Sequence, residues 1–274
     1  MRWETLGRAP EEMMQGATAV DGNTVYVTPG YTHHVWAYDL KEDNWTRLPD
    51  CPQQDAGLSI VCGLLTAVGG RTNDGDVTNT LVSLTESHSK WTEHFPPMPM
   101  ELDYPATLST GNHLVVVANL EKEVQVMNTT SLRWFFASSL PFPLFNPSLA
   151  VCGTEVYVLD YKGSVFSCTL LQSSSAVKWE TNVWRSLAKV PVEGSTLATL
   201  CGQLVAVGGQ NAIVEVESVI HLYSLSMDSW HISEHMPTAR YECLVATLPG
   251  DTLVVIGGVT TRGRCDAVEV VYPV

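Results

Sequence analysis

The chain has 274 residues, with 15 Lys and Arg against 29 Asp and Glu and a formal net charge of −14. Hydrophobic residues make up 45% and charged residues only 16%, so the chain can bury a large core and a disordered chain is disfavoured. The acidic balance argues against nucleic acid or an anionic membrane as the main partner, since both bind cationic faces.

Targeting signals and the cysteines of the sequence indicate in which cellular compartment the protein is expected. No apolar run approaches the roughly 18 residues of a membrane-spanning helix, and residues 1–10 lack the apolar core of a signal peptide. The seven cysteines are an odd number without a CxxC pair. We therefore expect a reduced, cytoplasmic chain without a disulfide framework.

Two residue types recur along the whole chain with a common spacing of 41 to 50 residues. The first series consists of the tryptophans Trp3, Trp45, Trp91, Trp134, Trp184 and Trp230. The second consists of glycines that precede a short apolar run, namely Gly22, Gly63, Gly111, Gly153, Gly202 and Gly250. Two independent series with one period indicate six copies of one structural unit.

Each unit is predicted to form about four short strands. In the fifth unit these are residues 196–201, 203–207, 219–225 and 229–234. The runs are rich in Val, Leu and Tyr and are bounded by Gly, Asn and Pro, and no useful amphipathic helix is visible. Four-stranded units of this length predict an all-β fold, a six-bladed propeller of antiparallel blades.

The chain ends predict how the ring closes. The last unit lacks a tryptophan strand, and the segment around Trp3 resembles that missing strand. We expect residues 1–10 to complete the sixth blade, which makes one domain over residues 1–274. The approximate blades are 11–50, 51–98, 99–142, 143–191, 192–237 and 238–274.

The fifth unit resembles the kelch repeat most clearly. The resemblance rests on Gly208-Gly209, Tyr223, Trp230, Met236-Pro237 and Arg240. The third and fourth units depart from it, because Ala118-Asn119 and Asp160-Tyr161 replace the glycine pair. The resemblance implies a non-catalytic protein-interaction module, such as the substrate receptor of a ubiquitin ligase. An actin-associated or signalling scaffold, or a metal-dependent kelch-type enzyme, is the alternative.

The loops predict which face binds. With the strands of a blade named a to d, the b–c and d–a loops share one face of the ring. The a–b turns are uniform, whereas the b–c loops vary from about ten residues, 71–80, to two after Tyr161. Variable loops on a rigid scaffold are the usual place for binding, and the resemblance implies the same face. The expected partner-binding residues are Tyr31, His33, Asp55, Arg71, Asn73, Asp74, Asp103, Tyr104, Phe145, Tyr161, Gln210, Asn211, Arg240, Tyr241, Arg262 and Arg264.

The charges of this face suggest its partner. The d–a loops carry one base, Arg240, and seven acids: Glu11, Glu12, Asp55, Glu101, Asp103, Glu193 and Glu242. With Arg262 and Arg264, Arg240 would form a single positive sector at the sixth blade, although Arg240 could instead brace the blade. A protein or peptide partner with basic residues and a carboxylate would suit such a face. The sequence leaves open whether it is a degron, actin or another scaffold.

Other features are expected to be structural. Cys62, Cys152 and Cys201 each precede a turn glycine and are predicted to be buried. The pair His33-His34 has no third ligand at a recognisable spacing, so we expect no metal and no cofactor. Residues 171–183 are predicted to be an insertion between strands c and d on the opposite face.

Overall fold

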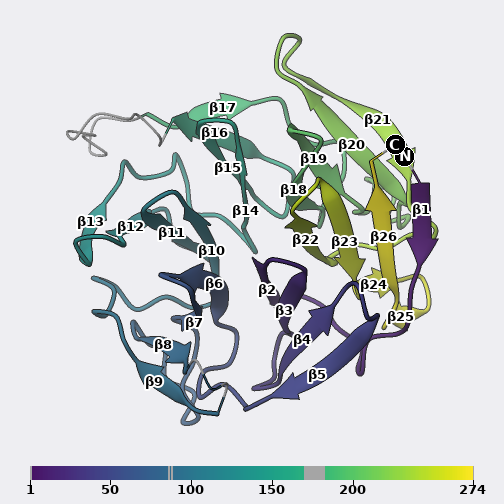
Figure 1. The fold of residues 1–274 in the computed structure, drawn as a ribbon. Coiled ribbons are helices and arrows are strands. Elements are labelled where there is room, and N and C mark those ends of the chain that lie inside the picture. Colours follow the sequence, from purple (N-terminus) through teal and green to yellow (C-terminus); the bar gives the residue numbers. More distant parts are fainter. Residues whose placement is uncertain (1, 86, 88, 170–182, 274) are drawn as a thin grey trace.

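A computed structural model of the chain describes residues 2–85, 87, 89–169 and 183–273. Six four-stranded antiparallel sheets surround a central axis, with one strand of each sheet nearest to it (Figure 1). The described residues contain no helix, and therefore none that could cross a membrane. The predicted all-β, six-bladed propeller is confirmed. The insertion expected at 171–183 lies outside the described residues apart from Val183.

The first three blades follow the chain in simple order, each from its inner strand a to its outer strand d. Blade 1 consists of β2 (Ala17–Asp21), β3 (Thr24–Thr28), β4 (Val35–Asp39) and β5 (Asn44–Leu48). Blade 2 consists of β6 (Gly57–Val61), β7 (Leu64–Val68), β8 (Leu81–Leu84) and β9 (Trp91–Glu93). Blade 3 consists of β10 (Pro105–Thr110), β11 (His113–Ala118), β12 (Gln125–Asn128) and β13 (Arg133–Phe136).

The next two blades repeat that order, and the sixth differs in its outer strand. Blade 4 consists of β14 (Ser148–Cys152), β15 (Glu155–Leu159), β16 (Val165–Thr169) and β17 (Arg185–Leu187). Blade 5 consists of β18 (Thr196–Leu200), β19 (Gln203–Val207), β20 (Val219–Ser224) and β21 (Ser229–His235). Blade 6 consists of β22 (Leu244–Leu248), β23 (Thr252–Ile256), β26 (Val268–Tyr272) and β1 (Arg2–Thr5). Its b–c loop carries a small hairpin of β24 (Val259–Thr260) and β25 (Gly263–Arg264).

The N-terminal strand closes the ring, as the sequence predicts. Strand β1 pairs antiparallel with β26, and Trp3 lies opposite Val271. The two chain ends therefore lie side by side (Figure 1). This pairing covers an edge of β26 that would otherwise be open to intermolecular strand pairing.

The apolar core is a ring of six interfaces between blades. Each of six buried clusters combines side chains of two adjacent blades, such as Val117 of blade 3 with Val158 of blade 4. Four of the periodic tryptophans add a hydrogen bond across such an interface. The indole Nε1–H of Trp230 donates to the carbonyl of Ala188 in the preceding blade over 2.8 Å, and Trp91, Trp134 and Trp184 do likewise. The repeated tryptophan thus marks a contact between neighbouring units.

The glycine pairs permit a close approach of two backbones. A Cβ atom on Gly208 would lie 2.2 Å from the carbonyl oxygen of Arg240, which belongs to the loop entering the next blade. A Cβ atom on Gly257 would lie 2.2 Å from the carbonyl oxygen of Met13 in the same way. Because only glycine leaves room there, each pair fixes where the following d–a loop crosses the blade.

None of the three cysteines beside the turn glycines is buried, so the sequence-based expectation was wrong. Cys62 and Cys201 are exposed and Cys152 is half-buried. Cys62 and Cys201 are the first residues of two-residue hairpin turns and have φ of 50° and 51°. These turn tips lie outside the buried interfaces between blades, and the Cys62 thiol lies 3.6 Å from the carbonyl oxygen of Thr129.

Two alanine substitutions separate backbone strain from steric overlap. Gly202 and Gly208 both have left-handed φ, but a Cβ atom on Gly202 would have nothing within 4 Å. We expect Gly202→Ala to lower the free energy of unfolding by about 1 kcal/mol through strain alone. Gly208→Ala should cost about 2 kcal/mol more because of the overlap with Arg240. Denaturant unfolding measures both, and equal losses would contradict the close approach.

Candidate binding face

One residue near the end of each d–a loop contributes to a ring at one end of the central channel. The six ring residues are Gln15, Asp55, Tyr104, Asn146, Gly194 and Glu242. All have left-handed backbone, with φ between 44° and 66°, although only one is glycine. This shared conformation turns the chain from the loop into the inner strand. The ring borders a cavity of about 150 Å³ that is lined by residues from all six blades.

A second set of equivalent residues, two positions earlier, anchors the ring from below. These residues are Met13, Gln53, Leu102, Leu144, Val192 and Arg240, and all are buried. Four of the six are large apolar side chains that lie in the interfaces between blades. In each d–a loop a buried anchor residue is thus followed two positions later by a residue that lines the cavity. This spacing determines which loop residues can contact a partner.

Arg240 occupies one of these anchor positions, so it braces the blade. Its side chain has no exposed surface and forms an ion pair with Glu269, which is itself buried. Its Nη1 donates to the carbonyl oxygens of Gly257 and Ala267 over 3.0 and 3.1 Å. The charge suggested a contact with a partner, but the side chain does not reach the surface. Arg240 is therefore excluded from the candidate binding residues.

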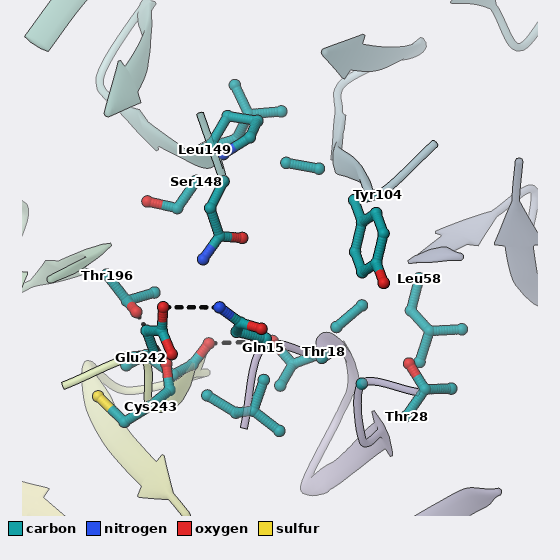
Figure 2. Close-up of a pocket in the computed structure, with 18 of the residues that line it drawn as sticks. Gln15, Thr18, Thr28, Leu58, Tyr104, Ser148, Leu149, Thr196, Glu242 and Cys243 are labelled. Carbon is teal, nitrogen blue, oxygen red and sulfur yellow. Dashed lines mark hydrogen bonds between the residues drawn. The ribbon is translucent and has the colours of Figure 1, made fainter. Parts of the chain in front are cut away.

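A hydrogen-bond network fixes one side of the mouth. The Tyr31 hydroxyl donates to Gln15 Oε1 over 2.6 Å, and Gln15 Nε2 donates to Glu242 Oε1 over 2.6 Å. The backbone N–H of Tyr31 donates to Asp55 Oδ1 over 2.7 Å. Figure 2 shows the bond between Gln15 and Glu242, with Tyr104 at a separate position along the pocket wall. The network holds both carboxylates in place before any partner arrives.

The mouth is acidic. Among the described residues that line the cavity, Asp55 and Glu242 are the only charged ones. Burial raises the pKa of the Glu242 carboxyl above its ordinary value, and only the hydrogen bond from Gln15 opposes that shift. Burial, and then the nearby charge of Asp55, raises the pKa of Tyr104. A cationic group at the mouth would offset the hydration that the Glu242 carboxylate loses on burial.

Aromatic rings surround the same opening. Tyr31 and Tyr104 make an edge contact with centroids 5.8 Å apart, and Phe145 and Tyr161 make another at 5.6 Å. Gln210 Nε2 donates to the Tyr161 hydroxyl over 3.0 Å, which fixes that ring. The structure thus brings these five predicted residues together in two groups, Tyr31 with Tyr104 and Phe145 with Tyr161 and Gln210. Rings of this kind contribute strongly to interfaces and can hold a cation on their faces.

Three other predicted residues mainly hold the loops. Arg71 pairs with Asp103 at 2.5 Å, and its Nη1 also donates to the carbonyl oxygen of Gly75 over 3.0 Å. His33 Nδ1 lies 2.8 Å from the carbonyl oxygen of Cys51. The charge of Arg71 is therefore already neutralised by Asp103.

The remaining predicted residues lie further out on this face. Asn73 and Asp74 are exposed at the tip of the blade 2 loop, and Arg262 and Arg264 are exposed on the β24–β25 hairpin. Tyr241 is half-buried, and its backbone pairs with Val259. Asn211 shapes the blade 5 loop through its side chain. The two hairpin arginines form no ion pair with the described residues, so the positive sector consists of them without Arg240.

Below the mouth the channel is lined by uncharged residues. A second cavity of about 460 Å³ is lined by the inner strands of all six blades. Both cavities share one residue from each inner strand: Thr18, Leu58, Thr107, Leu149, Leu197 and Val245. Across the described part of the chain, no group of three or more His, Cys, Asp or Glu side chains could hold a metal ion.

Comparison with known proteins agrees with this architecture. Residues 15–52 match the family model of the Kelch motif. The chain is 26% identical to Kelch-like protein terF of Aspergillus terreus over 195 residues, which are 61% of this chain and 42% of that protein. It is 29% identical to Alpha-scruin of Limulus polyphemus over 113 residues, 36% of this chain and 12% of scruin. It is 35% identical to Kelch-like protein 24 of Rattus norvegicus over 68 residues, 24% of this chain and 11% of the rat protein.

A solved structure shares the whole fold. The structure of YjhT superposes with a TM-score of 0.76 and covers 96% of this chain and 95% of its own, at 17% identity. That identity shows likeness of fold alone. The motif match, the Kelch-like relatives and the six-bladed ring together confirm the resemblance to kelch-repeat propellers. The chain spans less than half the length of the curated relatives it matches.

Removing one partner of the buried ion pair should destabilise the fold far more than replacing both partners with apolar residues. We expect Arg240→Ala to lower the free energy of unfolding by about 3 kcal/mol or more, because Glu269 is left as an unpaired buried charge. Changing both residues, Arg240→Met with Glu269→Leu, should recover most of that loss, since Met occupies the equivalent position 13. Denaturant unfolding of the two variants measures the difference. A single variant as stable as the wild type would contradict the bracing role.

Proposed function

We propose that the chain is a non-catalytic protein–protein interaction module that binds a protein or peptide on the b–c and d–a loop face. The observation that carries the proposal is the mouth itself. There, two prearranged carboxylates, Asp55 and Glu242, lie among aromatic rings on a face built from all six blades. The kelch-like relatives support an interaction role. A rigid ring limits the conformational entropy lost on binding.

The chemistry of the mouth favours a partner with basic residues. A Lys or Arg side chain at the opening would meet the two carboxylates and the faces of Tyr104 and Tyr161. Arg71 does not oppose this, because Asp103 already matches its charge. The exposed Arg262 and Arg264 lie on the blade 6 hairpin and could meet an acidic group on the same partner.

Capture of partners from a lysate of the source cell tests the face. The bait variant Asp55→Asn with Glu242→Gln keeps the shape of the mouth and removes two charges. We expect it to lose about tenfold in capture of the wild-type partners, since truncating charged contacts at an interface typically costs about 1–2 kcal/mol or more.

A matched control removes the same charge from the opposite face. Asp21 and Asp251 lie at the a–b ends of blades 1 and 6, away from the mouth. The variant Asp21→Asn with Asp251→Asn should capture the same partners as the wild type. Equal losses with both variants would show that net charge, and not the mouth, governs capture.

The raised pKa of Glu242 predicts a pH-dependent difference in stability. The pKa of the Glu242 carboxyl is higher in the folded than in the unfolded state, so the free energy of unfolding falls as pH rises from the unfolded-state pKa to the folded-state pKa. Glu242→Gln should therefore be at least as stable as the wild type at pH 7, and its advantage should shrink as pH falls towards 4. Paired denaturant titrations at both pH values measure this. An advantage that grows on acidification would contradict the burial of this carboxylate.

A narrower form of the proposal makes the protein a substrate receptor of a ubiquitin ligase. It is supported by the family resemblance and by relatives named Kelch-like proteins. Depletion of the full-length gene product should then raise the abundance of a captured partner, and a proteasome inhibitor should abolish the difference. Partner levels unchanged by depletion would leave a scaffold role in its place.

A further inference from the structure

Three b–c loops of the binding face contain the same five-residue turn. The turns are Thr72–Asp76 in blade 2, Asp160–Ser164 in blade 4 and Asn211–Glu215 in blade 5. In each, the N–H of the fourth residue donates to the carbonyl of the first, over 2.8 to 2.9 Å. The N–H of the first residue donates to the carbonyl of the fifth, over 2.9 to 3.0 Å. The three loops can therefore be compared position by position.

The fourth residue of this turn requires left-handed backbone. It is Gly75 in blade 2 with φ of 85° and Gly163 in blade 4 with φ of 88°, but Val214 in blade 5 with φ of 64°. Among the described residues, Val214 is the only β-branched one with positive φ. This conformation is strained for such a side chain, whereas glycine adopts it freely.

The fold gains little from the side chain that causes this strain. Val214 and its neighbour Ile213 are exposed to 71% and 74% of their surfaces. Apolar side chains left so exposed are not stabilised by packing within their own chain. A strained and exposed apolar residue in a loop is a reason to look for a binding role.

The loop is held rigid by its own polar groups. Asn211 Oδ1 accepts the N–H groups of Ile213 and Glu215, over 3.1 and 3.0 Å. The two apolar side chains are therefore presented in one backbone conformation, and binding would order little further.

Two other b–c loops of this face present apolar residues in the same manner. Tyr31 in blade 1 has φ of 66° and is 49% exposed, and Leu120 in blade 3 has φ of 60° and is 64% exposed. With Val214 they come from alternate blades, 1, 3 and 5. The blade 5 tip is thus part of a set of strained, exposed apolar positions on one side of the ring.

Acidic groups surround the base of the blade 5 tip. Asn211 Nδ2 donates to Glu215 Oε2 over 3.2 Å and to Glu217 Oε1 over 2.9 Å, which holds the two carboxylates close together. Neither carboxylate has an ion-pair partner among the described residues. A complementary surface would place Lys or Arg side chains beside these carboxylates.

We propose that Ile213 and Val214 form an apolar contact point that inserts into a recess of a partner protein, with Lys or Arg side chains of the partner bordering that recess. The proposal rests on the function proposed above, because the tip lies on the same loop face. It names the blade 5 tip as a principal contact and gives the chemistry of the surface that receives it.

Stability measurements test the strain with a matched pair of variants. Val214→Gly places in blade 5 the glycine that blade 2 has at this turn position, and Gly75→Val makes the reverse change in blade 2. A Cβ atom on Gly75 would have nothing within 4 Å, so Gly75→Val adds strain without steric overlap. We expect the first to raise Tm by about 2 °C and the second to lower it by about the same amount. If Val214→Gly lowers Tm while Gly75→Val leaves it unchanged, the strain argument fails.

Photo-crosslinking tests the contact. p-Benzoyl-phenylalanine replaces Ile213, or Asp21 on the opposite face as the control, and the protein is irradiated in lysate of the source cell. We expect the probe at 213 to label a partner in a segment where apolar residues adjoin Lys or Arg. Excess wild-type chain should suppress this labelling about tenfold. The variant Ala212→Asn, Ile213→Asp, Val214→Gly, which carries the blade 2 turn, should not suppress it.

The outcomes separate this inference from the proposed function. If the loop variant suppresses labelling as well as the wild type while the mouth variant Asp55→Asn with Glu242→Gln does not, the tip is not a contact and the function stands. If both variants suppress fully, the inference and the proposed function both fail. Absence of labelling, or labelling only in segments without Lys or Arg, also overturns the inference.

Discussion

The close approach of the glycine pairs to the next d–a loop is the constraint on which the binding face depends. Where Gly208 faces the carbonyl of Arg240, the loop is held against the blade beneath it. That contact buries the anchor residue and leaves the residue two positions later, Glu242, in left-handed backbone beside the cavity. Gly257 and Gly69 face the carbonyls of Met13 and Leu102 in the same way, and these contacts leave Gln15 and Tyr104 beside the cavity without a part in the core. The face can therefore vary in sequence while the scaffold does not.

Much of the fold could be predicted from the sequence because the repeat records the contacts between blades. Trp230 recurs because its indole bonds to the preceding blade, and Gly202 recurs because a two-residue turn needs positive φ. The N-terminal closure followed from one missing strand. The third and fourth units lack the glycine pair, yet the ring continues through them. In blade 4 the b–c loop is short, and Gly163 occupies the left-handed position of the same five-residue turn in which blade 2 has Gly75.

The site was harder to predict, because the direction of a side chain depends on its position relative to the anchor. Arg240 carries a charge that suggests a surface role, but the register places it with Met13 and Leu144, inside the blades. Gln15 was missed as a mouth residue, since an uncharged amide gives no signal of its own. Its position two residues before the inner strand, equivalent to that of Asp55, was the available clue. Aligning the six loops backwards from their inner strands would have separated buried anchors from mouth residues.

The central claim is that one face of the ring, built from the b–c and d–a loops, binds a partner. Hydrogen exchange of the propeller, alone and with a captured partner purified to homogeneity, tests it most directly. The account predicts slower exchange in peptides that span 210–217 and 239–243, with no change in those that span the a–b turns at 199–204 and 248–253. Protection confined to the a–b turns, or spread evenly over both faces, would contradict it.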